Sequence, residues 1–421
     1  MSIFKEQKMS KIKNITAKEI KDSRGNPTIE VELETDKKSF VASVPSGAST
    51  GKNEALELRD KDGKGVFDAI SNINKIIVPK LKNYNIEEQE KIDKFLIELD
   101  STENKSKLGA NAILAVSMAV CRAGAFAKKI PLYKYISILA DNNDLLKIPL
   151  PSFNILEGGA HAQNDLDIQE FMVVPQKKTF AENLMAGSKV FQNLKELLVK
   201  NYGEKATVIG DEGGFAPPIS NTQQALYLLK SAIGDMGVKI AIDVAASQFY
   251  ENPSPDGSGQ VKKYYLDGKE FTRSALLDFY KEIINSFPII SIEDPFEEND
   301  WKGFEEITKE LPNIAIIGDD LTTTNIKRIK EAHNKLACNG VILKLNQIGT
   351  VFETIEAGKL AKSFGWKTIV SHRSGETLDD FISDLAVGIG ADFIKSGSPT
   401  KEERMVKYNR LLQIESELNK K

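Results

Sequence analysis

Six short apolar segments recur between Val238 and Ser398, and each ends in charged or hydrogen-bonding residues. Unbroken runs of Val, Ile and Leu, without alternation of apolar and polar positions, are typical of strands covered on both faces in a parallel sheet. From the second segment onward the polar ends fall 26, 25, 28 and 23 residues apart, which is room for a strand, a helix and two loops. The pattern predicts a (β/α)8 barrel. The segments are VKIAID (ending at Asp243), IISIED (Glu293), IAIIGDD (Asp319), GVILKLNQ (Lys344), TIVSHRS (His372) and FIKSGS (Lys395).

The polar ends of these segments are segregated by charge, with carboxylates on three consecutive ends and cationic groups on the next three. In a (β/α)8 barrel, the carboxyl ends of the strands form the active site. A single polar residue after a strand is commonly a helix cap, and capping can explain Asp320 and Asn325. It does not explain six successive ends, and a lysine inside ILKLN is costly to bury unless it is paired or functional. The pattern therefore indicates a metal site facing an anion site.

The first 140 residues favour a separate α+β domain. Strand-like segments flank a turn signal at Arg24–Pro27, which predicts a hairpin, and the strand-like segment SFVASV follows. From Asp68 to Lys129 apolar residues recur every three or four positions, so we expect helices, the last one rich in alanine and centrally packed. We expect an N-terminal extension at 1–9, an α+β domain at 10–140 and a barrel at 141–421.

The barrel is expected to begin near Pro149 with an irregular arrangement. The segment EFMVVP favours a strand that begins, rather than ends, at Glu170. A helix, the glycine-rich turn GDEGG carrying Glu212 and a second helix follow, so the early strands precede paired helices. Of the three histidines, His161 follows a Gly-Gly-Ala sequence and His372 ends a predicted strand, whereas His333 lies on a predicted helix and is expected to be structural.

Composition narrows the class of protein. The chain has 421 residues, a formal net charge of −4 and scattered lysines and arginines, which argues against nucleic-acid binding. No apolar run is expected to approach the roughly 18 residues of a membrane span, and MSIFKEQKMSKIK lacks the apolar core of a secretory signal. We therefore expect a cytoplasmic protein with no membrane span. Cys121 and Cys338 are expected to be reduced core residues rather than a disulfide.

The run Gly47–Lys52 invites interpretation as a phosphate-binding P-loop, but the spacing is wrong. Only three residues separate its glycines, and Asn53 stands where Ser or Thr would hold Mg²⁺. The run is better interpreted as a mobile loop, hinged by glycine, whose hydroxyls could reach a ligand. Taken alone, this stretch favours an ordinary surface loop.

Several motifs together resemble the enolase family, over nearly the whole chain from about Ile15 to Leu418. Multiple motifs of six or more residues in one order are far more specific than any single pattern. The resemblance implies an N-terminal α+β domain followed by an enolase-type barrel whose first turns read ββαα. The motifs are DSRGNPT (22–28), VPSGASTG (44–51), EALELRD (54–60), NKSKLGANAIL (104–114), GDEGGFAP (210–217), SIEDPF (291–296), GDDL (318–321), KLNQIGT (344–350), SHRSGET (371–377) and IKSG (394–397).

The chemistry implied by the resemblance is the reversible loss of water from 2-phosphoglycerate to give phosphoenolpyruvate. The enzyme must take a weakly acidic C2 proton beside a carboxylate that is already an anion, and divalent cations stabilise the added charge. In this superfamily a Lys or His base works with Mg²⁺. By resemblance, Asp243, Glu293 and Asp319 hold the first Mg²⁺. A second Mg²⁺ is expected to arrive with substrate, held partly by the loop of Ser49.

The resemblance also implies roles for the remaining site residues. Lys344 would be the general base, which requires a lowered pKa, and nearby Lys395 and the two cations would act in that direction. The other roles are Glu212 as general acid with Glu170 beside it, Arg373 and Ser374 as phosphate binders, Lys395 as the contact to the substrate carboxylate, and Gln169, His161 and His372 as neighbours of the substrate, with His161 on a closing loop.

The chain departs from the usual family pattern at four positions. Glu157 replaces Asn, Gln248 replaces Glu, Leu378 stands where an acidic residue is common, and Lys401 lies where an Arg-Ser pair is usual. None removes a catalytic group, but Glu157 adds a carboxylate near the loop of an anionic substrate. Such a change bears on rate, loop closure and substrate preference.

Two alternative functions stay open at this stage. A paralogue acting on a phosphonate analogue would keep the same machinery and alter the phosphate pocket. A binding role at the cell surface could use the terminal Lys420-Lys421 pair, although a solvated tail is the simpler interpretation. A racemase of the wider superfamily is disfavoured, because it would need a second base opposite Lys344. The family forms homodimers and higher homo-oligomers, and we expect at least a dimer.

Overall fold

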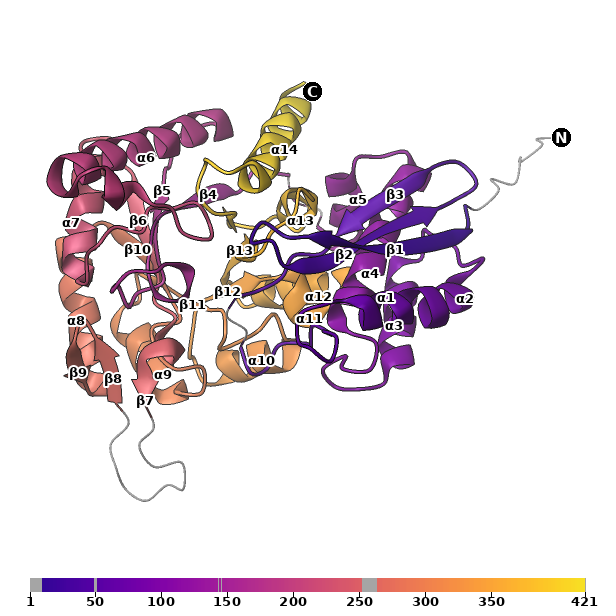
Figure 1. The fold of residues 1–421 in the computed structure, drawn as a ribbon, viewed down its shortest axis with the longest axis horizontal. Coiled ribbons are helices and arrows are strands. Elements are labelled where there is room, and N and C mark those ends of the chain that lie inside the picture. Colours follow the sequence, from indigo (N-terminus) through magenta and orange to yellow (C-terminus); the bar gives the residue numbers. More distant parts are fainter. Residues whose placement is uncertain (1–9, 49–50, 143, 145, 252–262, 421) are drawn as a thin grey trace, which may run out of the picture.

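The computed structural model describes residues 10–48, 51–142, 144, 146–251 and 263–420. The chain forms an N-terminal α+β part beside a larger barrel (Figure 1). The N-terminal sheet is antiparallel, in the order β1-β2-β3. The predicted hairpin is confirmed: Gly25 adopts a φ of 82°, and the side chain of Asp22 accepts hydrogen bonds from the backbone N–H groups of Arg24 and Asn26. The strands are β1 (Asn14–Lys21), β2 (Pro27–Glu34) and β3 (Ser39–Ser43).

Helices follow the sheet, as the apolar spacing predicted, and α4 packs against β2 and β3. One expectation about α4 needs correction. It is 19 residues long and apolar enough to cross a membrane by length and composition alone, although no such run was expected. Its apolar surface is used inside the protein, where 83% of the apolar window is buried. The helices are α1 (Phe67–Asn72), a π-helical turn (Ile73–Ile77), α2 (Val78–Leu81), α3 (Gln89–Asp100), α4 (Ala110–Lys128) and α5 (Leu132–Leu139).

The barrel is closed by eight strands in the order β10-β11-β12-β13-β14-β4-β5-β6. The six strands predicted between residues 238 and 398 are all present. Seven strands run in one direction, and β5 alone is antiparallel to both its neighbours. The strands are β4 (Leu150–Glu157), β5 (Glu170–Val174), β6 (Lys239–Asp243), β10 (Ile289–Glu293), β11 (Ala315–Gly318), β12 (Gly340–Leu343), β13 (Lys367–Ser371) and β14 (Phe393–Lys395).

Helices surround the barrel, and most of their N-termini carry a side-chain cap. Asn325 accepts a hydrogen bond from the N–H of Lys327, so it is a cap, as expected. Asp320 is not one, because the next helix begins only at Ile326. On the same helix, His333 stacks on Phe364 with ring centroids 3.6 Å apart, as expected of a structural residue. The helices are α6 (Phe180–Tyr202), α7 (Thr222–Ile233), α8 (Arg273–Ser286), α9 (Trp301–Glu310), α10 (Ile326–Asn334), α11 (Leu345–Ile348), α12 (Val351–Ser363), α13 (Phe381–Gly388) and α14 (Glu402–Asn419).

A small antiparallel sheet between β6 and α8 was not predicted. It consists of β7 (Tyr250–Glu251), β8 (Lys263–Leu266) and β9 (Lys269–Phe271). Its turn is Asp267-Gly268, in which both residues have positive φ. An Asp-Gly pair between apolar segments is a strong hairpin signal, and it was present in YYLDGKEF.

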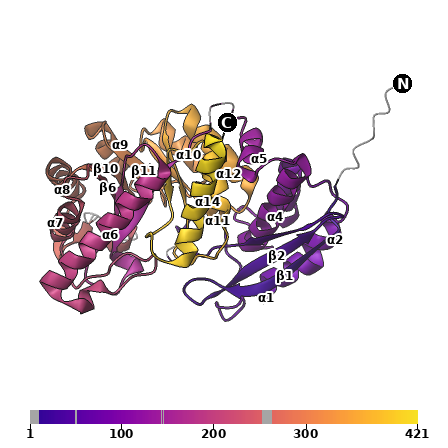
Figure 2. The ribbon, with the colours of Figure 1, turned by 90° about the horizontal axis from the view of Figure 1, so that it is seen from above.

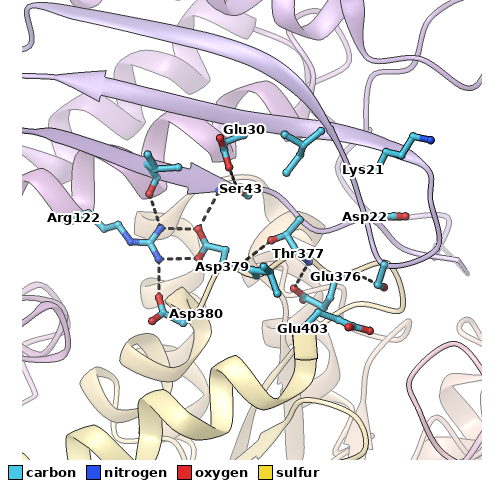
Figure 3. A pocket seen from close by; sticks show the side chains of 14 residues that line it. Lys21, Asp22, Glu30, Ser43, Arg122, Glu376, Thr377, Asp379, Asp380 and Glu403 are labelled. Atoms are coloured by element: carbon cyan, nitrogen blue, oxygen red, sulfur yellow. Dashed lines mark hydrogen bonds and ion pairs between the residues drawn. The ribbon is translucent and has the colours of Figure 1, made fainter. Parts of the chain in front are cut away.

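The two parts of the chain meet where the N-terminal sheet approaches the loop after β13. Arg122 of α4 donates two hydrogen bonds to Asp379 and one to Asp380 (Figure 3). A pocket of about 560 Å³ lies at this junction. Figure 2 shows α14 beside α6. Cys121 and Cys338 are both free and buried, as expected.

Candidate active site at the carboxyl-terminal rim of the barrel

Three carboxylates converge at the carboxyl-terminal rim of the barrel. Asp243 ends β6, Glu293 ends β10 in register with it, and Asp319 follows the last residue of β11. All three are buried, and ligand oxygens from the three lie within 4.8 Å of one another. Asp294 fixes the turn after β11, because its carboxylate accepts the N–H groups of Asp319 at 2.9 Å and Asp320 at 2.7 Å. A set of three oxygen donors suits a hard divalent cation such as Mg²⁺.

Lys395, at the end of β14, extends its ammonium group into this cluster. Its Nζ lies 3.0 Å from carboxylate oxygens of Asp243, Glu293 and Glu170. Burial lowers the pKa of Lys395, but these three carboxylates outweigh burial and raise the pKa well above its usual value. The ammonium therefore balances part of the negative charge that would otherwise be buried among the carboxylates.

Lys344 follows β12, and its Nζ lies 2.5 Å from Oδ2 of Asp319. The other carboxylate oxygen of Asp319 accepts a hydrogen bond of 2.8 Å from Gln347. Burial lowers the pKa of Lys344, and Lys395 acts in the same direction, as expected. The charge of Asp319 outweighs both, so the pKa is raised. Lys395 alone does not make Lys344 a neutral amine.

A second pair of carboxyl groups, Glu170 and Glu212, lies on the other side of the rim. Because β5 is reversed, Glu170 at its start pairs with Asp243 at the end of β6 and with Glu157 at the end of β4. His161 Nδ1 is 3.5 Å from Glu170 and 3.7 Å from Glu212. Burial and the charge of Glu212 raise the pKa of Glu170 well above its usual range. For Glu212, burial is outweighed by His372 and His161, and the pKa is lowered. Of the two, Glu170 is the carboxyl whose surroundings favour the protonated form.

His372 holds Glu212 from the end of β13. Its Nε2 lies 3.1 Å from Oε2 of Glu212, and its Nδ1 lies 2.6 Å from Nη1 of Arg404 on α14. A guanidinium can only donate, so Nδ1 is the acceptor and Nε2 carries the proton on the side of Glu212. Burial lowers the pKa of His372 to about 4, and the imidazole is neutral near pH 7. Asn154 of β4 donates a further hydrogen bond to Glu212.

The predicted phosphate binders lie next to the N-terminal loop. Arg373 donates to both carboxylate oxygens of Glu54, at 2.7 and 3.2 Å. Ser374 Oγ accepts the N–H of Ala48 at 2.8 Å. A side chain at Gly47 would collide with the Arg373 guanidinium, so this close approach requires glycine. Ser49, predicted to bind the second Mg²⁺, lies outside the described residues.

Gln169 and Gln248 connect the His161 turn to the carboxylate cluster. Gln248 donates to Gln169 at 2.7 Å and accepts the N–H of Ala160 at 3.2 Å. Gln169 in turn donates to Asp243 at 3.3 Å. A relay of amide hydrogen bonds thus joins the turn that carries His161 to the predicted metal ligand Asp243.

The structure therefore brings together every predicted site residue that it describes, and it adds partners that were not predicted. One of them is the fully buried Arg404, whose side chain also donates to the carbonyls of Arg373 and Ser374. The only available signal for Arg404 was a long basic side chain on an amphipathic helix, which is too common to single it out. The other unpredicted partners are Glu54, Asn154, Asp294 and Gln347.

Comparison with known protein families agrees with the fold. The family model described as the enolase N-terminal domain matches residues 12–136. The model described as the enolase C-terminal TIM barrel domain matches residues 145–421, most of the chain. The acidic cluster at the rim is compatible with the metal binding of this superfamily. The chain belongs to the enolase superfamily of enzymes.

Proposed function

We propose that the protein catalyses the reversible dehydration of 2-phosphoglycerate to phosphoenolpyruvate. One observation supports this reaction above all. In the eight-strand ring, β12 and β5 are four places apart, so Lys344 and Glu170 lie on opposite sides of the rim. An elimination needs a base at one carbon and an acid at the next, and a site with a lysine facing a carboxyl pair supplies both.

Lys344 is the base that takes the C2 proton onto Nζ. It must be neutral to do so. Burial disfavours its ammonium form most, and the positive charges of Arg373 and Lys395 disfavour it further. In the structure the charge of Asp319 outweighs them and raises the pKa of Lys344, and Mg²⁺ held by Asp319 would offset that charge. Asp243, Glu293 and Asp319 would hold Mg²⁺, which supplies positive charge for the substrate carboxylate as negative charge builds on it.

The Glu170–Glu212 pair supplies the acid. The hydroxyl at C3 leaves as water after it takes a proton from Glu212, while the electron pair of the broken C2–H bond forms the C2–C3 double bond. Glu170 is the member of the pair whose raised pKa favours holding a proton, and both carboxyls lie within 4 Å of His161 Nδ1. We infer that the proton reaches Glu212 through this short contact before the hydroxyl leaves.

Arg373 and Ser374 bind the phosphate group. The fork of Arg373 now holds the Glu54 carboxylate through two hydrogen bonds, the same geometry that a phosphate would use. Substrate phosphate therefore competes with Glu54. The Ser374 hydroxyl ties the same loop to the barrel through Ala48, so phosphate binding and the position of the loop are linked.

The test is the Mg²⁺-dependent appearance of the ultraviolet absorbance of phosphoenolpyruvate from 2-phosphoglycerate, with chelator as control. Lys344→Ala should bind Mg²⁺ but lose exchange of the C2 proton with deuterium from solvent. Glu212→Gln should keep this exchange and lose dehydration. If Lys344→Ala keeps the exchange, Lys344 is not the base.

The phosphonate alternative is decided in the same assay. With both substrates supplied in competition, we expect 2-phosphoglycerate to be consumed first. Preference for the phosphonate analogue would reassign the protein to a paralogous activity. We further propose a cytoplasmic homodimer or higher homo-oligomer, which sedimentation velocity would test.

A further inference from the structure

The five-residue loop Gly210–Gly214 lies between α6 and α7 and carries Glu212; we call it the acid loop. Its backbone carbonyls accept hydrogen bonds from the segment that follows β14. The N–H of Ser398 donates to Glu212 O at 3.0 Å, and Thr400 Oγ1 donates to Gly213 O at 3.3 Å. Lys401 Nζ donates to the carbonyls of Gly210 at 3.0 Å and Asp211 at 3.1 Å. The segment after β14 thus engages four consecutive carbonyls of the loop.

Glu157, at the end of β4, binds the opposite polar face of the same loop. Its Oε2 accepts the N–H of Glu212 at 3.2 Å, and its Oε1 accepts the N–H of Gly214 at 2.5 Å. The carboxyl group is fully buried. A Cβ on Gly210 would collide with Oε2, and one on Gly214 would lie 2.9 Å from Oε1. The glycines of the loop leave room for this carboxyl group.

The chemistry of these contacts requires two acceptor oxygens at position 157. Burial and the charge of Glu212 raise the pKa of Glu157 to about 8, but the neutral and charged forms both present two oxygens to the two N–H groups. An amide presents one oxygen and one NH₂ donor, so Gln would leave one loop N–H facing a donor. The shorter Asn, usual in the family, has one acceptor as well.

Two departures from the usual family pattern, Glu157 and Lys401, therefore act on the same loop, one through its N–H groups and the other through its carbonyls. We propose that Glu157 and Lys401 are a pair of positioning residues that fix the acid loop, and with it the Glu212 carboxyl group, by binding the N–H and carbonyl faces of its backbone. The inference rests on the proposed dehydration, in which Glu212 is the acid.

Glu157 and Lys401 act only on the half of the reaction that protonates the leaving hydroxyl. Lys344 directly follows β12, and within the described residues its ion pair is with Asp319 and its backbone N–H donates to Thr324, neither of which lies in the acid loop. A loosened loop should therefore slow protonation of the leaving hydroxyl and leave removal of the C2 proton intact. Substrate affinity should hold, since Arg373, Ser374 and Lys395 lie on other strand ends.

The kinetic experiment compares Glu157→Gln, Lys401→Met and Lys401→Arg in the full-length protein. For the first two, we expect kcat to fall roughly 10- to 100-fold, the cost of a small misplacement of a catalytic group. KM should stay within about twofold and exchange of the C2 proton should stay near the wild-type rate. Lys401→Arg should recover most of the activity, because a guanidinium can reach the same two carbonyls. Parallel loss of exchange and turnover, or an unchanged kcat, would overturn the proposal.

A matched control is Asp100→Asn. Asp100 is also a buried carboxyl group that accepts two backbone N–H groups of one loop, those of Thr102 and Leu108, but in the N-terminal domain. We expect this variant to lose stability without the separation of exchange from turnover. The same separation in Asp100→Asn would show that general loosening, rather than the acid loop, causes it.

Hydrogen exchange of backbone amides tests the contacts independently of the reaction. In Glu157→Gln, the amides of Glu212 and Gly214 should exchange faster than in wild type, while those of β12 should not change. Unchanged exchange in the acid loop would overturn the positioning role. If the loop loosens but the wild-type protein does not dehydrate 2-phosphoglycerate, the contacts stand and the reaction assignment fails.

Discussion

Arg404 and His372 form a buried contact in which a guanidinium N–H of Arg404 donates to Nδ1 of the imidazole at 2.6 Å. The donor comes from the last helix of the chain and the acceptor from the end of β13. Because the contact leaves the proton on Nε2, it places an N–H 3.1 Å from Glu212, and this neighbour lowers the pKa of that carboxyl. One residue on α14 thereby acts on the carboxyl that serves as the acid in the proposed reaction.

Replacement of Arg404 by methionine should allow the His372 ring to adopt its other tautomer, with the proton on Nδ1. We expect kcat for dehydration to fall by about 100-fold, and the nitrogen-15 shifts of the His372 ring to show protonated Nδ1 in part of the population. Arg410→Met is the control, since Arg410 lies on the same helix but pairs with Asp384 outside the site. A wild-type tautomer in Arg404→Met would contradict the assignment.

Replacement of Asp319 by asparagine should weaken Mg²⁺ binding by at least about tenfold, because affinity follows the charge of the ligand set. Calorimetric titration with Mg²⁺ alone measures this without any turnover. The comparison variant is Asp320→Asn, because Asp294, Asp319 and Asp320 form a second cluster with ligand spacing. If Asp320→Asn weakens binding as much as Asp319→Asn, the second cluster is the site.

Removal of the Glu54 charge should strengthen phosphate binding. In Glu54→Gln a neutral amide faces Arg373, so we expect the Kd for inorganic phosphate to fall by roughly tenfold, equivalent to ~1.4 kcal/mol. The control is Glu353→Gln, which breaks the ion pair with Lys105 instead. Weaker binding of phosphate by Glu54→Gln would mean that Glu54 orients Arg373 rather than competing for it.

Asp93 should make the protein less stable as pH rises. Burial raises its pKa from 3.8 to about 6, against hydrogen bonds from Gln89 and the N–H of Phe352. The folded state therefore binds this proton more tightly than the unfolded state. Stability is lost as pH rises from about 4 to about 6, by about 3 kcal/mol in all, and the loss persists above that range.

The variant Asp93→Asn keeps an acceptor for both hydrogen bonds and cannot ionise. Its free energy of unfolding in urea should exceed that of wild type near pH 7.5 and match it near pH 4. An equal difference at both pH values would show that Asp93 does not titrate in this range.

The barrel could be predicted from sequence because its strands are short apolar runs with polar ends, a pattern that local chemistry sets. Asp243, Glu293 and Lys395 were found in this way. The reversal of β5 was not predicted. A five-residue apolar strand has the same hydrophobic pattern in either direction. Only the pairing of Glu170 with Asp243 and Glu157 shows why Glu170 stands at the beginning of β5.

The contacts that tune the site were beyond sequence reasoning, because they join residues far apart in the chain. Nothing in the local sequence of Arg404 or Glu54 indicates His372 or Arg373 as a partner. Glu157 was noticed only as a departure from a family pattern, and its two backbone partners depend on a glycine-rich loop more than fifty residues later. The Asp267-Gly268 turn could have been predicted and was overlooked.

The pairing of β14 with β4 also has a consequence for protein synthesis. The N-terminal sheet contains consecutive strands and can form while the chain is still growing. The ring of the barrel cannot close until Lys395 has been made, and the acid loop and His372 gain Lys401 and Arg404 later still. A nascent chain on the ribosome should therefore hold a folded first domain beside an open barrel until Lys401 and Arg404 have emerged.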